Sequence, residues 1–391
     1  MNPAYMNPAA TVFLFSVAFI LYVLAGYPLI LAAWAKAFPR PIRKEFVRRT
    51  VSVIVPVRNG ARWVEAKIQS LLQSNYPGDL LDILIVSDGS SDGTDELVRR
   101  YPDSRVRLLS LRPGGKAIAV SRGLESVAGE IIVLTDVRQA FDPDAIRRLV
   151  ACFADPSVGV VTGELVIREG SSHEQYNTGL YWLYEKWIRR NLNRINAMLG
   201  ATGSIYAIRR ELAVHIPPEI LLDDVYVPFA VALRGASDAS RIYFEDDAKA
   251  YDLPTSLHTE FWRKVRTQAG VYQILFRFPA LLSPFNRRFL HFLSHKLGRL
   301  LLPFAMLTAV IASFFLPQPW RVPLLLSQGL FYLLAVIDPV IPERSPLKRL
   351  SAVIRAFVVL TAAAFCALAV FILPAQKLWK ETLVESARSS P

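Results

Sequence analysis

Apolar residues follow two different patterns along the chain, with long runs toward both ends and short runs in the middle. In the middle, the runs Val51–Val57 and Ile83–Val86 have the length and composition of strands buried on both faces. Between them, apolar residues recur at helical spacing: Val64, Ile68, Leu71 and Leu72. This order predicts a β-α-β unit, which builds a parallel sheet with ligands at the carboxyl ends of its strands.

The same patterning continues to about residue 255. Further strands are predicted at 106–111, 131–134, 158–162 and 205–208, and further helices at 116–125, 143–153, 173–198 and 223–233. Strands that alternate with helices indicate an α/β domain with a mostly parallel sheet over residues 51–255.

The long apolar runs predict helices that span a membrane. Residues 12–34 form an uncharged run of the length needed to span a bilayer, and the region 300–373 holds three more runs, at about 300–317, 322–337 and 353–373. A secretory signal peptide is the alternative for the first run. Met1–Thr11 carries no charged side chain, whereas a signal peptide begins with a basic segment, so we expect a retained anchor.

Charge suggests how the spans are oriented. Six Lys and Arg residues lie within 36–49, directly after the first run, which predicts that the domain beyond them is cytoplasmic. Residues 256–299 alternate apolar with basic residues, a basic amphipathic pattern typical of helices that lie in the membrane interface. The net charge of +12 could also indicate nucleic acid, but no basic patch interleaved with aromatic residues supports that partner. Two distant cysteines, Cys152 and Cys366, imply neither a disulfide framework nor a zinc site.

Polar residues with chemical potential follow the predicted strands in a definite order. They are Pro56 and Arg58 after the first strand, Asp88 after the second, Lys116 in Gly114-Gly115-Lys116, Asp136 after 131–134, the pair Asp223-Asp224, and Arg263 with Arg266. Each has a structural alternative. Asp88 could begin an ordinary turn, Lys116 could be a solvated lysine, and adjacent acids at a helix start can simply complement the helix dipole.

Taken in this order, the motifs resemble those of the inverting family 2 glycosyltransferases, in the membrane-integral branch that includes the cellulose synthases. The resemblance implies a GT-A-like, Rossmann-related fold and a nucleotide-sugar donor. It further implies that Pro56, Arg58, Asp88, Lys116, Asp136, Arg263 and Arg266 bind that donor. The resemblance also implies that Asp224, the second member of the family's acid pair, acts as the general base beside Asp223.

The metal site departs from the family pattern. The family has Asp-x-Asp at the strand end, where the acids hold Mg²⁺ or Mn²⁺ against the diphosphate, but Arg138 replaces the second acid here. We expect Asp136 to bind the metal together with donor phosphates. The alternative is that Arg138 and Arg266 neutralise the diphosphate without a metal.

These observations predict a glycosyltransferase in the cell's inner or plasma membrane, with its catalytic domain in the cytoplasm. It would move a sugar from a nucleotide-diphosphate donor, expected to be a UDP-sugar, to a lipid or saccharide acceptor with inversion. The alternatives are a nucleotidyltransferase-like enzyme and a non-catalytic membrane scaffold with a decayed domain. The family's Gln-x-x-Arg-Trp motif keeps only its arginine, here Arg266, which weighs against processive polymer synthesis.

Overall fold

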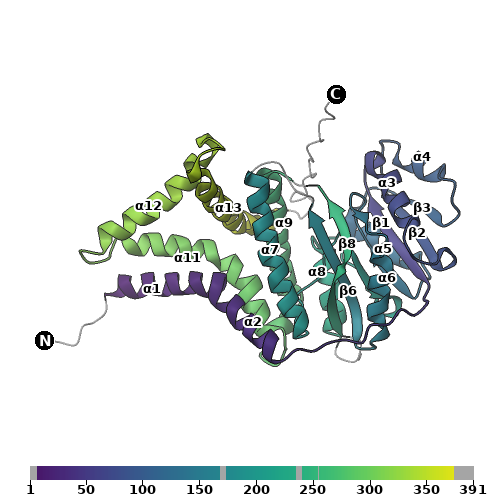
Figure 1. The fold of residues 1–391 in the computed structure, drawn as a ribbon, viewed down its shortest axis with the longest axis horizontal. Helices are drawn as coiled ribbons and strands as arrows, with labels where there is room; N and C mark the ends of the chain where they lie inside the picture. The colour runs from purple at the N-terminus through teal and green to yellow at the C-terminus, as the bar shows by residue number, and fades with distance from the viewer. Residues whose placement is uncertain (1–6, 168–172, 235–239, 254, 374–391) are drawn as a thin grey trace.

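The computed structural model describes residues 7–167, 173–234, 240–253 and 255–373, and it combines an α/β domain with a group of long helices (Figure 1). The strands are β1 Val51–Val57, β2 Leu81–Asp88, β3 Val106–Leu111, β4 Ile131–Leu134, β5 Ala140–Phe141, β6 Val158–Ile167, β7 Tyr206–Arg209 and β8 Arg241–Asp252. The helices of the domain are α3 Ala61–Leu72, α4 Thr94–Arg99, α5 Lys116–Glu125, α6 Ala145–Ala151, α7 His173–Arg194, α8 Asp223–Ala232 and α9 Leu257–Arg277.

The strands form one sheet with the order β3-β2-β1-β4-β7-β6-β8-β5. The pairs β1–β2, β2–β3, β1–β4 and β6–β8 are parallel, and the pairs β4–β7, β6–β7 and β5–β8 are antiparallel. The predicted β-α-β unit is confirmed, since β1 pairs with β2 in parallel with Val53 opposite Ile83. The parallel strands β1, β2 and β4 bring the segments that follow Val57, Asp88 and Leu134 to one edge of the sheet.

Two hydrophobic cores lie on the two faces of this sheet. Along β1, Val53 and Val55 belong to one core while Ile54 belongs to the other, as the two-residue period of a strand requires. Helix α5 approaches the sheet closely at Gly123, where a Cβ atom would lie only 2.7 Å from a methyl carbon of Ile54. A larger residue there would push α5, and Lys116 at its first turn, away from the sheet.

Within the described residues, four helices are long and apolar enough to cross a membrane: Pro8–Ala37, Phe289–Ser313, Arg321–Val340 and Pro346–Phe371. They contain α1 Pro8–Leu21 and α2 Tyr27–Ala37, joined by a π-helical turn, α10 Phe289–His291 and α11 Gly298–Ser313, also joined by a π-helical segment, α12 Arg321–Ile337 and α13 Pro346–Ala367. Their number agrees with the sequence prediction. The second of them begins at Phe289, before the predicted start at 300, so the predicted boundary between 299 and 300 falls inside a continuous helix.

The long helices and the α/β domain share packing surfaces. Tyr27, Leu31 and Ala35 of α2 belong to the same core as Ile54 of the sheet. Helices α7 and α9 lie between the sheet and the long helices in Figure 1, and α9 packs against both α7 and α13. The region 256–299, predicted as interfacial, therefore includes a helix that is packed into the protein, with Val265, Ala269 and Ile274 buried.

Candidate active site

A pocket of about 260 Å³ lies at the sheet edge where the polar strand ends converge, and it extends to the end of the helix Phe289–Ser313. Six of the residues singled out in the sequence line it: Lys116, Asp136, Asp223, Asp224, Arg263 and Arg266. They come from α5, the end of β4, the start of α8, and α9, which are far apart in the sequence.

Asp88 has a supporting position at the end of β2. Its carboxylate accepts hydrogen bonds from the backbone N–H groups of Gly114 (2.6 Å) and Gly115 (2.9 Å). Gly115 adopts a φ of 92°, a conformation that side-chain-bearing residues rarely adopt. Asp88 thus fixes the conformation of the Gly-Gly turn before α5, and this turn positions Lys116 in the pocket. The carboxylate is only 4% exposed, so it faces the protein more than the pocket.

Pro56 and Arg58 stand at the carboxyl end of β1, outside the pocket lining. Arg58 is exposed, and the next residue, Asn59, joins this strand end to the Asp88 loop because its backbone N–H donates to Ser90 Oγ at 3.0 Å. Pro56, Arg58 and Asp88 therefore flank the site along the two neighbouring strands and do not join the residues grouped around Lys116.

The ammonium of Lys116 bridges two carboxylates. Its Nζ lies 2.9 Å from Asp136 Oδ1 and 3.1 Å from Asp223 Oδ1. Burial lowers the pKa of Lys116, but the acids Asp136, Asp223 and Asp224 outweigh it and raise the pKa above the ordinary value. For Asp136, burial raises the pKa, and the cations Lys116, Arg266 and Arg138 reverse that effect, so the pKa of Asp136 is lowered. Both groups are charged at neutral pH.

Asp224 is electrostatically different from its neighbour acids. Burial and the adjacent charge of Asp223 raise its pKa to about 6, despite the opposing effect of Lys116. One of its oxygens, Oδ2, accepts a hydrogen bond from the backbone N–H of Gly203 at 2.9 Å. A carboxylate with a pKa near 6 is ionised at pH 7 and still basic enough to take a proton, which is the property required of a general base.

The structure adds a residue that the sequence analysis missed, Lys67 on α3. Its Nζ is buried and donates to Thr135 Oγ1 at 2.7 Å and to the carbonyl of Gln139 at 2.6 Å. Thr135 Oγ1 in turn donates to the carbonyl of Ser204 at 2.7 Å. Lys67 thereby ties the loop that carries Asp136 to the turn that supports Asp224. A lysine within the apolar stripe of α3 was the available sequence signal.

The pocket offers carboxylate oxygens that could bind a divalent cation. Asp136 and Asp223 direct carboxylate oxygens at one point, where Lys116 Nζ now lies, and such oxygens are the ligands that Mg²⁺ and Mn²⁺ prefer. Arg138 turns away from that point, because its Nη2 pairs with Asp252 Oδ2 at 2.6 Å. The residues fit a metal that binds together with donor phosphates, with Asp223 as a second carboxylate that the sequence analysis did not assign to the metal.

A second group of acids, Glu245, Asp246 and Asp247 on β8, could also hold a metal by proximity. These residues lie outside the pocket lining, and each forms an ion pair, with Lys44, Arg190 and Arg148 respectively. The group is therefore a charge-balanced part of the sheet surface rather than part of the site.

Comparison with solved structures identifies the fold. The structure superposes on a mannosyltransferase of Pyrobaculum calidifontis, solved with GDP-Man and Mn²⁺, with a TM-score of 0.70 at 22% identity, covering 92% of this chain and 98% of that one. The predicted GT-A fold is therefore confirmed: this is a GT-A domain combined with membrane-type helices.

Sequence comparison relates part of the chain to a known family. Residues 52–216 match the family model described as glycosyl transferase family 2. The chain is 26% identical over 237 residues to a poly-β-1,6-N-acetyl-D-glucosamine synthase of Staphylococcus aureus, covering 58% of this chain and 56% of that protein. It is 31% identical over 132 residues to a β-monoglucosyldiacylglycerol synthase of Synechocystis, covering 32% of this chain and 27% of that protein. The chain thus spans about half the length of the first relative and less of the second.

Proposed function

We propose that the chain transfers a hexose from a nucleotide-diphosphate sugar, with UDP as the nucleotide, to a hydroxyl of a membrane-associated lipid or saccharide acceptor, with inversion. The observation that carries the proposal is the arrangement of Asp224 in the pocket. This carboxylate has a pKa of about 6, and it lines one pocket together with cations suited to a diphosphate and with the N-terminal part of a helix that can span a membrane.

In the proposed reaction, Asp224 takes the proton of the acceptor hydroxyl as the oxygen attacks the anomeric carbon. A bond forms between that oxygen and the anomeric carbon, and the bond from the anomeric carbon to the diphosphate breaks. The diphosphate leaves with the electron pair, and the attack from the opposite side inverts the anomeric configuration. A prepositioned base of this kind typically contributes about 10²–10⁴ in rate.

The cations of the pocket would stabilise the leaving diphosphate. Arg266 lies close enough to Asp136, Asp223 and Asp224 for their charges to interact, and a guanidinium can bind phosphate oxygens in a bidentate manner. Asp136, with Asp223, would hold Mg²⁺ or Mn²⁺ against the phosphates, and the metal would supply further charge neutralisation there. When the donor is absent, the ammonium of Lys116 offsets the electrostatic repulsion between Asp136 and Asp223.

The relatives support this class of reaction, since their names describe one synthase of an aminosugar polymer and one of a glucosyl lipid. The mannosyltransferase with the similar fold was solved with a GDP-sugar. Experiment must therefore decide between uracil and guanine as the nucleobase of the donor. The proposal of UDP rests on the family resemblance.

The test uses the purified full-length protein in detergent with a panel of UDP- and GDP-sugars and a membrane lipid extract. The proposal predicts release of the free nucleoside diphosphate and, by mass spectrometry, an acceptor heavier by one hexose unit. Release of pyrophosphate would indicate nucleotidyl transfer. Absence of turnover with every donor would indicate a non-catalytic protein, and either result would contradict the proposal.

A further inference from the structure

The helix that carries the proposed base has no capping side chain at its start. Helix α8 begins at Asp223, and the side chain of the preceding residue, Leu222, makes no capping hydrogen bond. Backbone N–H groups in the first turn of a helix have no partners within the helix, so a side-chain cap usually helps to fix the start. The position of Asp224, the second residue of α8, therefore depends on contacts that other elements make with the residues before the helix.

Helix α9 supplies such contacts through the side-chain amide of Gln273. Its Oε1 accepts a hydrogen bond from the backbone N–H of Leu221 at 3.0 Å, and its Nε2 donates to the carbonyl of Glu219 at 2.8 Å. One amide group thus satisfies both a donor and an acceptor of the chain just before α8. These two hydrogen bonds attach the segment 219–222 to α9.

A further contact lies one turn earlier on α9, at Gly270. Leu222 packs directly against this glycine, since a Cβ atom at position 270 would lie only 2.3 Å from Leu222 Cγ. Both residues are buried, so even alanine at position 270 would force Leu222 to move within a packed core. Gly270 therefore allows α9 to approach the residue that directly precedes the acid pair.

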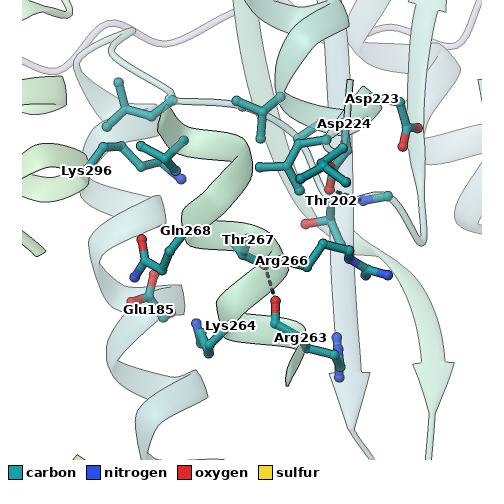
Figure 2. Close-up of a pocket in the computed structure, with 18 of the residues that line it drawn as sticks. Glu185, Thr202, Asp223, Asp224, Arg263, Lys264, Arg266, Thr267, Gln268 and Lys296 are labelled. Carbon is teal, nitrogen blue, oxygen red and sulfur yellow. Dashed lines mark hydrogen bonds between the residues drawn. The ribbon is translucent and has the colours of Figure 1, made fainter. Parts of the chain in front are cut away.

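These contacts and the arginine assigned to the diphosphate share one face of α9. Arg266, Gly270 and Gln273 are separated by four and then three residues, the spacing that places side chains on one side of a helix. Figure 2 shows Arg266 extending from α9 toward the side of Asp223 and Asp224. One helix therefore carries the proposed diphosphate ligand and holds the residues that precede the proposed base.

The base has a second, independent attachment in the turn at 200–203. The backbone N–H of Gly203 donates to Asp224 Oδ2 at 2.9 Å, and the backbone N–H of Ala201 donates to the carbonyl of Asp224 at 2.7 Å. Helix α9 keeps its own place by packing against α7 and α13. Loss of the Gln273 hydrogen bonds should therefore move Asp224 relative to Arg266 without unfolding either helix.

We propose that Gln273 and Gly270 are positioning residues that set the distance between Asp224 and Arg266. This inference rests on the proposed function, in which Asp224 takes the acceptor proton while Arg266 stabilises the diphosphate that leaves from the opposite side of the anomeric carbon. A misplacement of about 1 Å in such an arrangement can cost about 10² in rate. Neither Gln273 nor Gly270 lines the pocket, so their effect on transfer passes through Asp224.

The first test is Gln273→Met, which keeps the length of the side chain and removes both hydrogen bonds. The kcat for transfer should fall about tenfold or more, while the Kd for UDP, measured by calorimetry, stays within twofold and the binding stoichiometry is unchanged. The acidic limb of the pH profile should not shift, because Asp223 and Asp224 move together. Gln69→Met, the same change at an exposed glutamine of α3, is the matched control and should leave kcat unchanged.

Three results of this test would overturn the inference. The first is a kcat for Gln273→Met above half of the unsubstituted value. The second is a loss of UDP affinity or stoichiometry as large as the loss of kcat, because Gln273 would then support the donor site or the whole fold. The third is a shift of the acidic limb that accounts for the lower rate, because the basicity of Asp224 would then have changed rather than its position.

The second test is a double-mutant cycle between Gly270 and Leu222. Gly270→Ala should lower kcat, because the new methyl group displaces Leu222. Leu222→Ala removes the atoms that this methyl group would meet at 2.3 and 2.5 Å and leaves Cβ at 3.3 Å. Gly270→Ala should therefore cost less in the Leu222→Ala background than in the unsubstituted protein. Equal costs in the two backgrounds, or full activity of Gly270→Ala alone, would contradict the positioning role.

The failure of this inference differs from the failure of the proposed function. If the unsubstituted protein releases no nucleoside diphosphate with any donor, the proposed function itself is wrong. If the protein transfers sugar and the Gln273 and Gly270 variants transfer it equally fast, only the positioning role is wrong.

Discussion

The ammonium of Lys116 lies 2.9 Å from Asp136 Oδ1, in the position between Asp136 and Asp223 toward which both carboxylates point. This ion pair links the first turn of α5 to the end of β4, and it balances the acids of the pocket when no donor is present. It also means that a divalent cation must compete with, or displace, a lysine that is already well paired.

The first prediction concerns metal binding. Because Lys116 neutralises Asp136 and Asp223, calorimetry should detect no Mn²⁺ binding to the protein alone and clear binding after UDP is added, when phosphate oxygens complete the ligand set. Lys116→Met should expose the two carboxylates and allow Mn²⁺ to bind without UDP. Asp136→Ala should abolish binding in both cases. Mn²⁺ affinity that is equal with and without UDP in the unsubstituted protein would contradict this use of Lys116.

The second prediction concerns pH. Asp224 acts as a base only when ionised, and burial with the neighbouring Asp223 raises its pKa to about 6. The acceptor kcat/KM should therefore be constant above pH 7 and fall about tenfold per pH unit below pH 6, since the ionised fraction falls in that proportion. Asp223→Asn removes the like charge, so it should shift this acidic limb to lower pH. A limb that does not move, or moves to higher pH, would contradict the assignment.

The third prediction concerns Lys67, a positioning residue beneath the Asp136 loop. Lys67→Met leaves the buried carbonyl of Gln139 and the hydroxyl of Thr135 without this donor, which typically costs about 1–3 kcal/mol of unfolding free energy. Denaturation should show that loss, and the UDP-dependent Mn²⁺ affinity should fall as the loop loosens. Arg62→Met, exposed on the same helix, is the control and should change neither. Unchanged Mn²⁺ affinity in a destabilised Lys67→Met protein would limit Lys67 to a structural role.

Strand β1 was predicted from the sequence, whereas the role of Lys67 was not. The difference is that β1 depends on a local pattern and Lys67 on contacts with distant segments. The strands and crossover helices follow from local apolar periodicity, and the four long helices follow from uninterrupted apolar runs. The acids and lysine of the site follow from their places at strand ends and helix starts. Contacts between distant segments could not be read in this way. Asp252 engages Arg138 only because β8 lies at that edge of the sheet, and Lys296 reaches the pocket only because the helix Phe289–Ser313 begins earlier than its apolar run suggests.

The fourth prediction concerns the orientation in the membrane, which the six Lys and Arg residues within 36–49 predict. In a Cys366→Ser background, cysteines placed at the exposed sites Ser104 and Ser126 should react with a membrane-impermeant maleimide only after cells are permeabilised. A cysteine at the exposed Gln318, between α11 and α12, should react in intact cells because the second span would carry it to the outside. The reverse pattern would place the catalytic domain outside the cytoplasm.

The most direct test of the account is the transfer rate of Asp224→Asn in the full-length protein. The substitution keeps the size of the side chain and removes its basicity, so transfer should fall about 10²–10⁴-fold. The Kd for UDP should stay within twofold, and Asp246→Asn, outside the pocket on β8, should retain full activity. If Asp224→Asn keeps more than half of the transfer rate, Asp224 is not the base and the proposed mechanism is wrong.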